Sequence, residues 1–259
     1  MMKLTGKNVV ITGASSGIGR SLALQLAKEG CSLALLARRV EELETVARQA
    51  SQYNVIVKVY RCDVSNKDEV EKVFAHIKKF FSSIDVLVLN AGVSFRTDVR
   101  KDESAKAVQT FAVNVLGMVY CAGQVIPDFI QAKKGMIVGI SSLAESRGFP
   151  RSGFYCASKA AASTYLESLR VELKKYNIKV LTVKPGFVKT PMTDKNEFKM
   201  PFIIPVEKAV QIIVDGIKKE KKIIQFTFGA VLGIKILKAL PNWLFDFIAQ
   251  NQLKKPLKK

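Results

Sequence analysis

The chain has 259 residues, of which 48% are hydrophobic, and its 41 Lys and Arg exceed its 22 Asp and Glu to give a formal net charge of +19. This length and apolar content suffice for one domain with a substantial core and require no second domain. The charge favours anionic partners, namely cofactor phosphates, nucleic acid or acidic lipid headgroups, without choosing among them. The single histidine, His76, nearly excludes histidine triads and metal clusters, and we expect it to face solvent.

The four cysteines are scattered, with no Cys-x-x-Cys spacing: Cys31, Cys62, Cys121 and Cys156. This spacing argues against a zinc site or disulfide framework and favours buried thiols in a reducing compartment. The first strand pattern begins at Val9, which leaves no room for a signal peptide, so we expect a cytoplasmic protein.

Apolar, β-branched runs alternate with longer segments of helical period. The runs predict strands at 9–12, 32–37, 55–61, 86–90, 136–141 and 179–183. The segments between them predict helices at 19–29, 40–53, 67–80, 105–131 and 155–176. This alternation predicts an α/β fold, a doubly wound parallel sheet with helices on both faces. No repeat or linker divides the chain, so we expect one domain over residues 1–259.

A glycine-rich turn, Thr-Gly-Ala-Ser-Ser-Gly-Ile-Gly at 12–19, joins the first strand to the first helix. Gly13 permits the tight turn, Gly17 lets the backbone approach a pyrophosphate, and Gly19 lets the helix pack closely on the strand. The helix N-terminus adds unpaired N–H groups. In this context the turn predicts a Rossmann-type dinucleotide site that includes Gly13, Ser15, Ser16, Gly17, Ile18 and Gly19.

The second strand ends in Arg38 and Arg39, where an NAD-binding protein would carry an acidic residue for the ribose 2′-hydroxyl. Guanidinium groups bind a 2′-phosphate with charge-assisted hydrogen bonds, so NADP(H) is favoured over NAD(H). The alternative is that both arginines belong to a solvated turn.

The ends of the third and fourth strands supply further cofactor candidates. Asp63 and Val64 are placed to hold the adenine, although Asp63 could equally cap the helix that starts near Lys67. The small residues Asn90, Ala91 and Gly92 suit a close approach of the backbone to the cofactor.

Tyr155 and Lys159 lie four residues apart and therefore share one face of the predicted helix. A nearby ammonium stabilises phenolate and should lower the pKa of the tyrosine. Such a pair on its own could be merely solvated, but together with the glycine turn it indicates a nicotinamide-dependent oxidoreductase.

Over residues 7–192 the chain resembles the short-chain dehydrogenase/reductase family. The resemblance rests on the glycine turn, on Asn-Ala-Gly at 90–92, on Tyr155 with Lys159, and on Asn114, Ser142 and Pro185-Gly186. Two positions depart from the family pattern. Leu89 stands where a second Asn is common, and Ser16 stands where NADP-preferring members often carry a basic residue.

The resemblance implies roles for these residues. Tyr155 exchanges a proton with the substrate, Lys159 lowers its pKa and binds the nicotinamide ribose, Ser142 holds the substrate carbonyl, and Asn114 anchors a water that relays protons to Lys159. From the residues alone, Ser142 could instead cap a helix and Asn114 could satisfy a buried backbone group. The family's nicotinamide-contacting segment maps onto Pro185, Gly186, Val188 and Thr190.

Two later segments bear on the substrate and partners. Residues 187–202 resemble a substrate lid whose aromatic and Met side chains imply an apolar ketone, acyl or lipid-like substrate, unless they pack only as a surface loop. Residues 223–228 predict a last strand. The amphipathic, basic segment 229–259 suits a membrane headgroup region, a cover over the pocket or a subunit interface.

These patterns predict an NADP(H)-dependent oxidoreductase that acts on a carbonyl or alcohol. The alternative is a catalytically idle NADP-binding sensor, against which the intact Ser142, Tyr155 and Lys159 argue. No recognition motif supports nucleic-acid binding. By resemblance we expect a homodimer or homotetramer that forms through helices 105–131 and 155–176.

Overall fold

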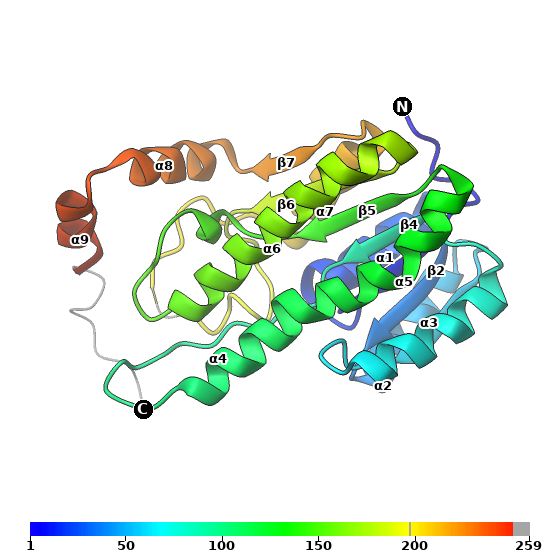
Figure 1. Ribbon diagram of the computed structural model, residues 1–259, viewed down its shortest axis with the longest axis horizontal. Coiled ribbons are helices and arrows are strands. Elements are labelled where there is room, and N and C mark those ends of the chain that lie inside the picture. Colours follow the sequence, from blue (N-terminus) through cyan, green and yellow to red (C-terminus); the bar gives the residue numbers. More distant parts are fainter. Residues whose placement is uncertain (197, 251–259) are drawn as a thin grey trace.

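The computed structural model describes residues 1–196 and 198–250 and contains a seven-stranded sheet in the order β3-β2-β1-β4-β5-β6-β7, with every pair of neighbours parallel (Figure 1). The strands are β1 Asn8–Thr12, β2 Ser32–Ala37, β3 Val57–Arg61, β4 Val86–Leu89, β5 Met136–Ile140, β6 Lys179–Pro185 and β7 Ile223–Phe226. The strand order reverses between β1 and β4, which is where open parallel sheets bind ligands at their carboxyl ends.

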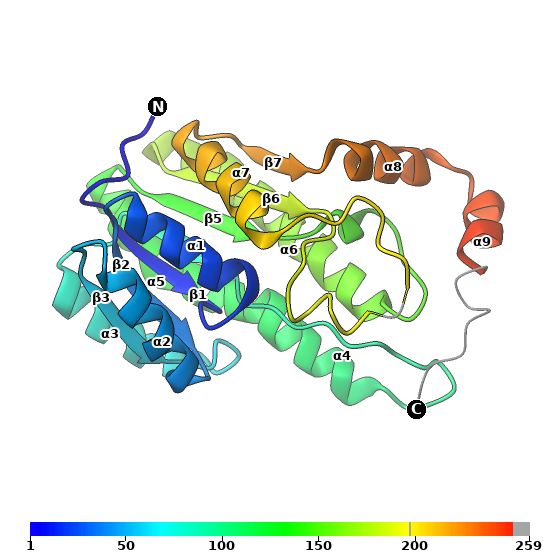
Figure 2. The ribbon, with the colours of Figure 1, turned by 180° about the vertical axis from the view of Figure 1, so that it is seen from behind.

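Helices cover both faces of the sheet. In Figure 2, one face carries α1 Gly17–Lys28, α2 Val40–Ser51 and α7 Val206–Lys218. The other face carries α3 Lys67–Phe81, α5 Gly117–Ala132 and α6 Gly153–Glu172. A π-helical turn, Ala112–Leu116, joins α4 (Ser104–Phe111) to α5. Short 3₁₀ helices at Leu143–Ser146 and Leu173–Tyr176 complete these layers.

The core is two apolar layers, one on each side of the sheet. Successive strand side chains point to opposite faces, so Val9 and Ile11 pack towards α1 and α7, whereas Val10 packs towards α3 and α5. Both faces of the central strands are buried, which explains their continuous apolar sequence. The predicted doubly wound fold is confirmed.

The helical run Ser104–Ala132 is long and apolar enough to cross a membrane by length and composition. Its Cys121, Val125 and Phe129 are buried in the layer against the sheet, as in the core helix of a globular protein. Elsewhere, His76 faces solvent and the four cysteines are free and buried, as expected.

Several details differ from the prediction. The expected helix at 105–131 is interrupted by the π turn, and α7 was not predicted although its apolar residues recur with helical period. The last strand ends at Phe226, because Phe228 already begins α8 (Phe228–Ala239). After α8 comes α9, Asn242–Gln250, and the two helices extend beyond β7 along one end of the molecule (Figure 1). Of the predicted basic segment 229–259, residues 251–259 lie outside the described residues.

Candidate active site

The glycine turn after β1 is fixed by steric limits. Gly13 has φ +67°, and a Cβ there would lie 2.7 Å from the Cα of Ala91. A Cβ on Gly19 would lie 2.3 Å from the carbonyl oxygen of Gly13 and 2.4 Å from Nδ2 of Asn90. Only glycine therefore fits at these two positions, and the N-terminus of α1 closes tightly over the strand.

Hydrogen bonds tie the ends of β1 and β4 together. Thr12 Oγ1 accepts from the backbone N–H groups of Asn90 (3.0 Å) and Ala91 (3.1 Å). Asn90 Nδ2 donates to the carbonyl oxygens of Thr12 (3.0 Å) and Gly13 (3.1 Å). Asn90 therefore holds the glycine turn through its side chain, whereas the sequence had suggested only a small residue beside the cofactor.

A cavity of about 300 Å³ opens along this carboxyl edge of the sheet. Nearly every predicted site residue lines it: Gly13, Ser15, Ser16, Gly17, Ile18, Arg38, Arg39, Asp63, Val64, Asn90, Ala91, Gly92, Ser142, Tyr155, Lys159, Pro185, Gly186, Val188 and Thr190. Of the predicted set, Gly19 and Asn114 do not line the cavity and lie behind its wall. Pro191, Met192 and Thr193 also line the cavity and belong to the predicted lid 187–202, whereas the sequence had not indicated the remaining lining residues, namely Ala37, Cys62, Val93, Val113, Ile140 and Ser141.

The two arginines after β2 differ in their contacts. Arg39 Nη2 donates hydrogen bonds to Ser15 Oγ (3.0 Å) and Ser16 Oγ (2.8 Å), so its guanidinium lies over the glycine turn. Arg38 Nη1 lies 3.9 Å from an oxygen of Asp63, which follows the neighbouring strand β3, and both residues line the cavity. Both arginines line the cavity, and the side chain of each is 54% exposed.

Asp63 does not cap the helix that follows it. Asn66 caps α3, since its Oδ1 accepts from the backbone N–H of Glu69 (3.1 Å). Asp63 Oδ1 accepts from the N–H (3.0 Å) and Oγ (2.7 Å) of Ser65. Partial burial opposes ionisation, but these bonds and the nearby Arg38 outweigh it and hold the pKa of Asp63 below its ordinary value.

Tyr155 and Ser142 meet at the far end of the cavity. Ser142 Oγ accepts from the N–H of Ala144 (3.1 Å), so Ser142 caps the 3₁₀ helix and also lines the cavity. Burial raises the pKa of Tyr155, and a hydrogen bond with Ser142 offsets only part of that rise. The net direction is opposite to the lowered pKa that the Tyr155–Lys159 spacing predicted, because desolvation of the phenolate outweighs the stabilising contacts.

Lys159 is buried, and its ammonium turns towards β5. Its Nζ donates to the carbonyl oxygen of Ile140 (2.8 Å) and lies 5.8 Å from the ring centroid of Tyr155. Burial lowers the pKa of Lys159 to about 8, although the carboxylate of Glu145 favours the charged form. Lys159 can therefore change its protonation state close to neutral pH.

Asn114 sits in the π turn between α4 and α5. Its Nδ2 donates to the carbonyl oxygen of Val93 and to Ser158 Oγ (both 2.9 Å), and its Oδ1 accepts from the N–H of Val93 (2.8 Å). A π turn changes the direction of side chains on a helix, and such turns are frequent at functional sites. Asn114 therefore holds the segment that follows β4, at Val93, against α6, the helix that carries Tyr155.

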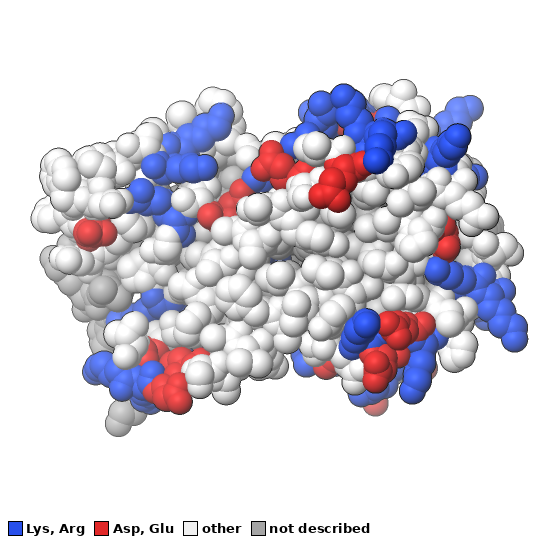
Figure 3. All heavy atoms as spheres, viewed as in Figure 1, with Lys and Arg blue, Asp and Glu red and all other residues white. Residues whose placement is uncertain are grey.

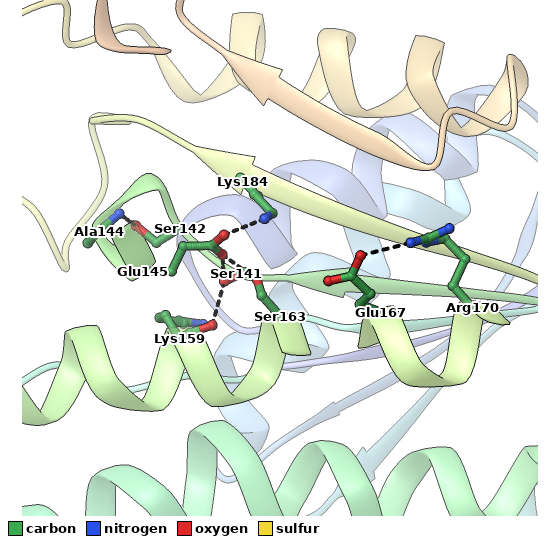
Figure 4. Close-up of polar contacts among 9 residues, drawn as sticks. All are labelled: Ser141, Ser142, Ala144, Glu145, Lys159, Ser163, Glu167, Arg170 and Lys184. Atoms are coloured by element: carbon green, nitrogen blue, oxygen red, sulfur yellow. Dashed lines mark hydrogen bonds and ion pairs between the residues drawn. The ribbon is translucent and has the colours of Figure 1, made fainter. Parts of the chain in front are cut away.

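Glu145, which the sequence did not single out, organises the other side of the site (Figure 4). Its carboxylate accepts hydrogen bonds from Ser163 on α6 and from Ser141 (2.8 Å), and it forms an ion pair with Lys184 on β6. Ser141 Oγ also lies 3.0 Å from the carbonyl oxygen of Lys159. This network joins β5, β6 and α6 directly beneath Ser142 and Lys159.

The segment 187–202, of which Glu197 lies outside the described residues, forms a loop over the carboxyl edge. Phe187 packs edge-on against Phe198 with ring centroids 5.8 Å apart, and Arg96 lies 5.6 Å from the Phe198 ring. Thr193 Oγ1 donates to the carbonyl oxygen of Val188 (2.7 Å), which shapes the stretch that includes Met192 on the cavity wall.

Within residues 1–196 and 198–250 no cluster of His, Cys, Asp and Glu side chains is arranged to hold a metal. The doubly wound sheet, the glycine turn at its switch point and a phenol with a lysine at the end of the same cavity define a class of protein, the nicotinamide-dependent oxidoreductases that act on CH–OH or C=O groups.

Comparison with known proteins identifies the family. The model of the short chain dehydrogenase family matches residues 7–200. An uncharacterized oxidoreductase from Myxococcus xanthus is 34% identical over 97% of this chain and 99% of its own. An NADP-dependent 3-hydroxy acid dehydrogenase from Schizosaccharomyces pombe is 37% identical over 73% of this chain and 74% of its own.

Among solved structures, a short chain dehydrogenase/reductase from Burkholderia phymatum in complex with NAD has the same fold, with a TM-score of 0.84 at 21% identity over 100% of this chain and 99% of its own. The chain belongs to the short-chain dehydrogenase/reductase family, and it is an oxidoreductase that uses a nicotinamide cofactor.

Proposed function

We propose that this oxidoreductase uses NADP(H) to reduce an apolar carbonyl compound, or to oxidise the corresponding alcohol, with Tyr155 as the general acid and base. The observation that carries the proposal is the single cavity that joins the glycine turn and Arg39 at one end to Ser142, Tyr155 and Lys159 at the other. A dinucleotide placed along this cavity would bring its reactive ring to the phenol.

The residues present fit a dinucleotide, because the glycine turn lines the cavity and the N-terminus of α1, which has no side-chain cap, offers its backbone N–H groups to a pyrophosphate there. The bound cofactor would supply or accept the hydride. For reduction, the Tyr155 hydroxyl would give its proton to the substrate oxygen as the carbonyl carbon gains hydride. The raised pKa of Tyr155 suits this direction, because it keeps the phenol protonated.

The neighbouring residues would assist that proton transfer. The Ser142 hydroxyl would donate a hydrogen bond to the same substrate oxygen as negative charge develops on it. The Lys159 ammonium would stabilise the phenolate left on Tyr155 and hold the ribose of the cofactor. Asn114 would anchor the water that returns protons to Lys159, which fits its position against Val93 and Ser158 on the far side of the wall.

Arg39 supports the choice of NADP(H). Its guanidinium already bridges Ser15 and Ser16, and together these groups present several donors to a 2′-phosphate beside the turn. Arg38 and the ionised Asp63 lie opposite, where they would flank the adenine. The Schizosaccharomyces pombe relative is also named as NADP-dependent.

The loop 187–202 supports an apolar substrate. Met192 lines the cavity, and Phe187 and Phe198 of the same loop pack edge-on against each other. A ketone, an acyl thioester or another lipid-like carbonyl compound would bury its chain against Met192 and the apolar side chains of this loop.

The test is oxidation of NADPH and of NADH by the full chain over ketones, quinones, steroids and β-ketoacyl thioesters, with Tyr155→Phe as the matched variant. We expect turnover with NADPH, and about a thousandfold loss in Tyr155→Phe, because the proton donor is removed while the cavity keeps its shape. Binding of NADPH, measured by quenching of fluorescence, should persist in the variant.

Turnover retained by Tyr155→Phe would overturn the proposed mechanism. Tight NADPH binding with no turnover on any compound would favour the alternative, a catalytically idle sensor of NADP.

We further propose that the protein acts in the cytoplasm as a homodimer or homotetramer. Four free, buried thiols suit a reducing compartment. The exposed Val108 and Phe111 of α4 and Val171 of α6 supply apolar surface on the helices expected to meet a second copy, and Figure 3 shows a broad uncharged area in the middle of the face that these helices cover. Sedimentation equilibrium would give the number of subunits, and a monomer at micromolar concentration would contradict this assignment.

A further inference from the structure

Five large apolar side chains on α8 and α9 project away from the rest of the described chain. We call them the C-terminal stripe. Phe228 is 83% exposed, Trp243 72%, Phe247 66% and Ile236 54%, and Leu232 is also exposed. No residue of α8 is buried, although all twelve are described. So much apolar surface on two consecutive helices marks an interaction site.

The spacing of the stripe places it on one face of each helix. Phe228, Leu232 and Ile236 follow one another at intervals of four residues on α8, and Trp243 and Phe247 do the same on α9. On the opposite side, α9 is anchored, because Phe245 packs under the guanidinium of Arg147 at 4.1 Å and edge-on to Phe149 at 6.2 Å. Residues 1–196 and 198–250 therefore anchor α9 through Phe245 and leave the stripe uncovered.

Positive charge accompanies the stripe. Lys235 and Lys238 are exposed on α8, and Asp246 is the single acidic residue between Phe228 and Gln250. Four further lysines follow in the sequence at 251–259, outside the described residues. At the α8 and α9 end of the molecule, Figure 3 shows mainly uncharged surface with Lys and Arg beside it.

We propose that the C-terminal stripe docks on the surface of a membrane that contains anionic phospholipids. The apolar side chains would enter the boundary between headgroups and acyl chains, and the indole of Trp243 would lie at headgroup level. The lysines would extend their ammonium groups to the lipid phosphates while their methylene stems stay on the apolar side. The helices would lie along the surface, because α8 has twelve residues and cannot span a bilayer.

A second copy of the chain fits this surface less well. A two-fold interface places the same patch on both sides, so each side would bring Lys235 and Lys238, with Asp246 as the only acidic residue of α8 and α9 to offset them. An anionic lipid surface would accommodate both the apolar side chains of the stripe and the lysines beside it.

Docking would also place the loop 187–202 next to the bilayer. α8 begins against that loop, since a Cβ on Gly229 would meet the ring of Phe202 at 2.7 Å and one on Gly186 would meet Cβ of Ala230 at 3.1 Å. Delivery of a lipid-like substrate from the membrane rests on the proposed function, whereas docking does not depend on turnover.

Trp243 is the only tryptophan in the chain and therefore reports directly on the stripe. The full chain is mixed with vesicles of phosphatidylcholine alone or with phosphatidylglycerol added. With the anionic vesicles we expect a blue shift of the tryptophan emission and co-flotation of the protein, both weakened by salt. Neither readout needs catalysis, so failure of docking and failure of the proposed activity can be told apart.

The double variant Ile236→Gln, Phe247→Gln should bind the anionic vesicles at least about tenfold more weakly, because two side chains no longer enter the apolar boundary. The matched control is Ile56→Gln, since Ile56 is 53% exposed but lies just before β3 at the opposite edge of the sheet. Its affinity for vesicles should equal that of the unchanged chain.

Three results would overturn the proposal. The first is an unshifted emission and no flotation with anionic vesicles at low salt. The second is equal binding by the double variant and the Ile56→Gln control, which would mean that the lysines bind without the stripe. The third is vesicle-independent self-association that the double variant abolishes, which would assign the stripe to a second copy of the chain.

Discussion

The carboxyl edge of the sheet and the C-terminal helices differ in whether their side chains have partners among the described residues. At the edge, the buried Thr12, Asn114 and Lys159 each have hydrogen-bond partners, and the apolar strands behind them are covered on both faces. On α8, large apolar side chains face outward. The first region is fixed by contacts within the chain. The second is anchored on one side through Phe245, but its outward apolar side chains are exposed, which indicates an interaction site.

The steric limit at the glycine turn predicts a large change in stability. Gly19→Ala should lower the free energy of unfolding by about 2–3 kcal/mol, because the new methyl would overlap the Gly13 carbonyl and the Asn90 amide. On α8, Gly233→Ala is the matched control, since a Cβ there meets nothing within 4 Å, and it should be neutral or stabilising. Urea unfolding measures both, and equal effects would mean that the turn tolerates a side chain.

The next largest expected effect is on the preference for NADPH over NADH and arises at the end of the cavity formed by the glycine turn. Arg39→Asp should reduce the NADPH to NADH ratio of kcat/KM about a hundredfold, because charge-assisted bonds are lost and a carboxylate would repel the 2′-phosphate. Arg48→Asp on α2 makes the same change in net charge away from the turn and should leave the ratio unchanged. A ratio that stays constant in Arg39→Asp would show that the arginine does not contact the cofactor.

The variant Glu145→Gln tests whether the carboxylate of Glu145 influences the pKa of Lys159 and so the pH dependence of activity. Glu145 favours the ammonium form of Lys159, so Glu145→Gln should lower the pKa of Lys159 below about 8. Activity that needs the ammonium is lost as pH rises through that pKa, and the variant should therefore lose activity at lower pH than the unchanged chain. We expect about a tenfold fall in kcat at pH 8 with a smaller change at pH 6.

Two further variants isolate this effect. Glu167→Gln removes another glutamate of an ion pair, with Arg170 on α6 (Figure 4), and should leave the pH profile unchanged. Glu145→Gln combined with Lys184→Met also removes the lysine that the first change leaves unpaired. If the double variant regained the original pH profile, unpaired Lys184 rather than the lost carboxylate would be the cause.

How far the sequence predicted these regions depends on whether the signal was local. The strands and the glycine turn were predicted because alternation, strand runs and glycine spacing lie within short stretches. The π turn at Ala112–Leu116 was missed, since one extra residue in a helix leaves no mark on its composition. Glu145 was missed because it lies in a short 3₁₀ helix and its ion-pair partner, Lys184, lies 39 residues away on β6. The direction of the Tyr155 pKa was wrong because spacing gives proximity but not burial.

The smallest expected change in the free energy of unfolding is that of a substitution on α8, compared with one at a buried position of α7. Ile213 is fully buried on α7, so Ile213→Ala should cost about 2–5 kcal/mol of unfolding free energy. Ile236→Ala on α8 should change it by no more than about 0.5 kcal/mol, because that side chain is exposed in the folded chain as in the unfolded one. Urea unfolding of dilute protein without lipid measures both variants under the same conditions. A loss above about 1 kcal/mol in Ile236→Ala would mean that Ile236 is covered in solution, although residues 1–196 and 198–250 leave it exposed, and a loss that grows with protein concentration would assign the cover to a second copy.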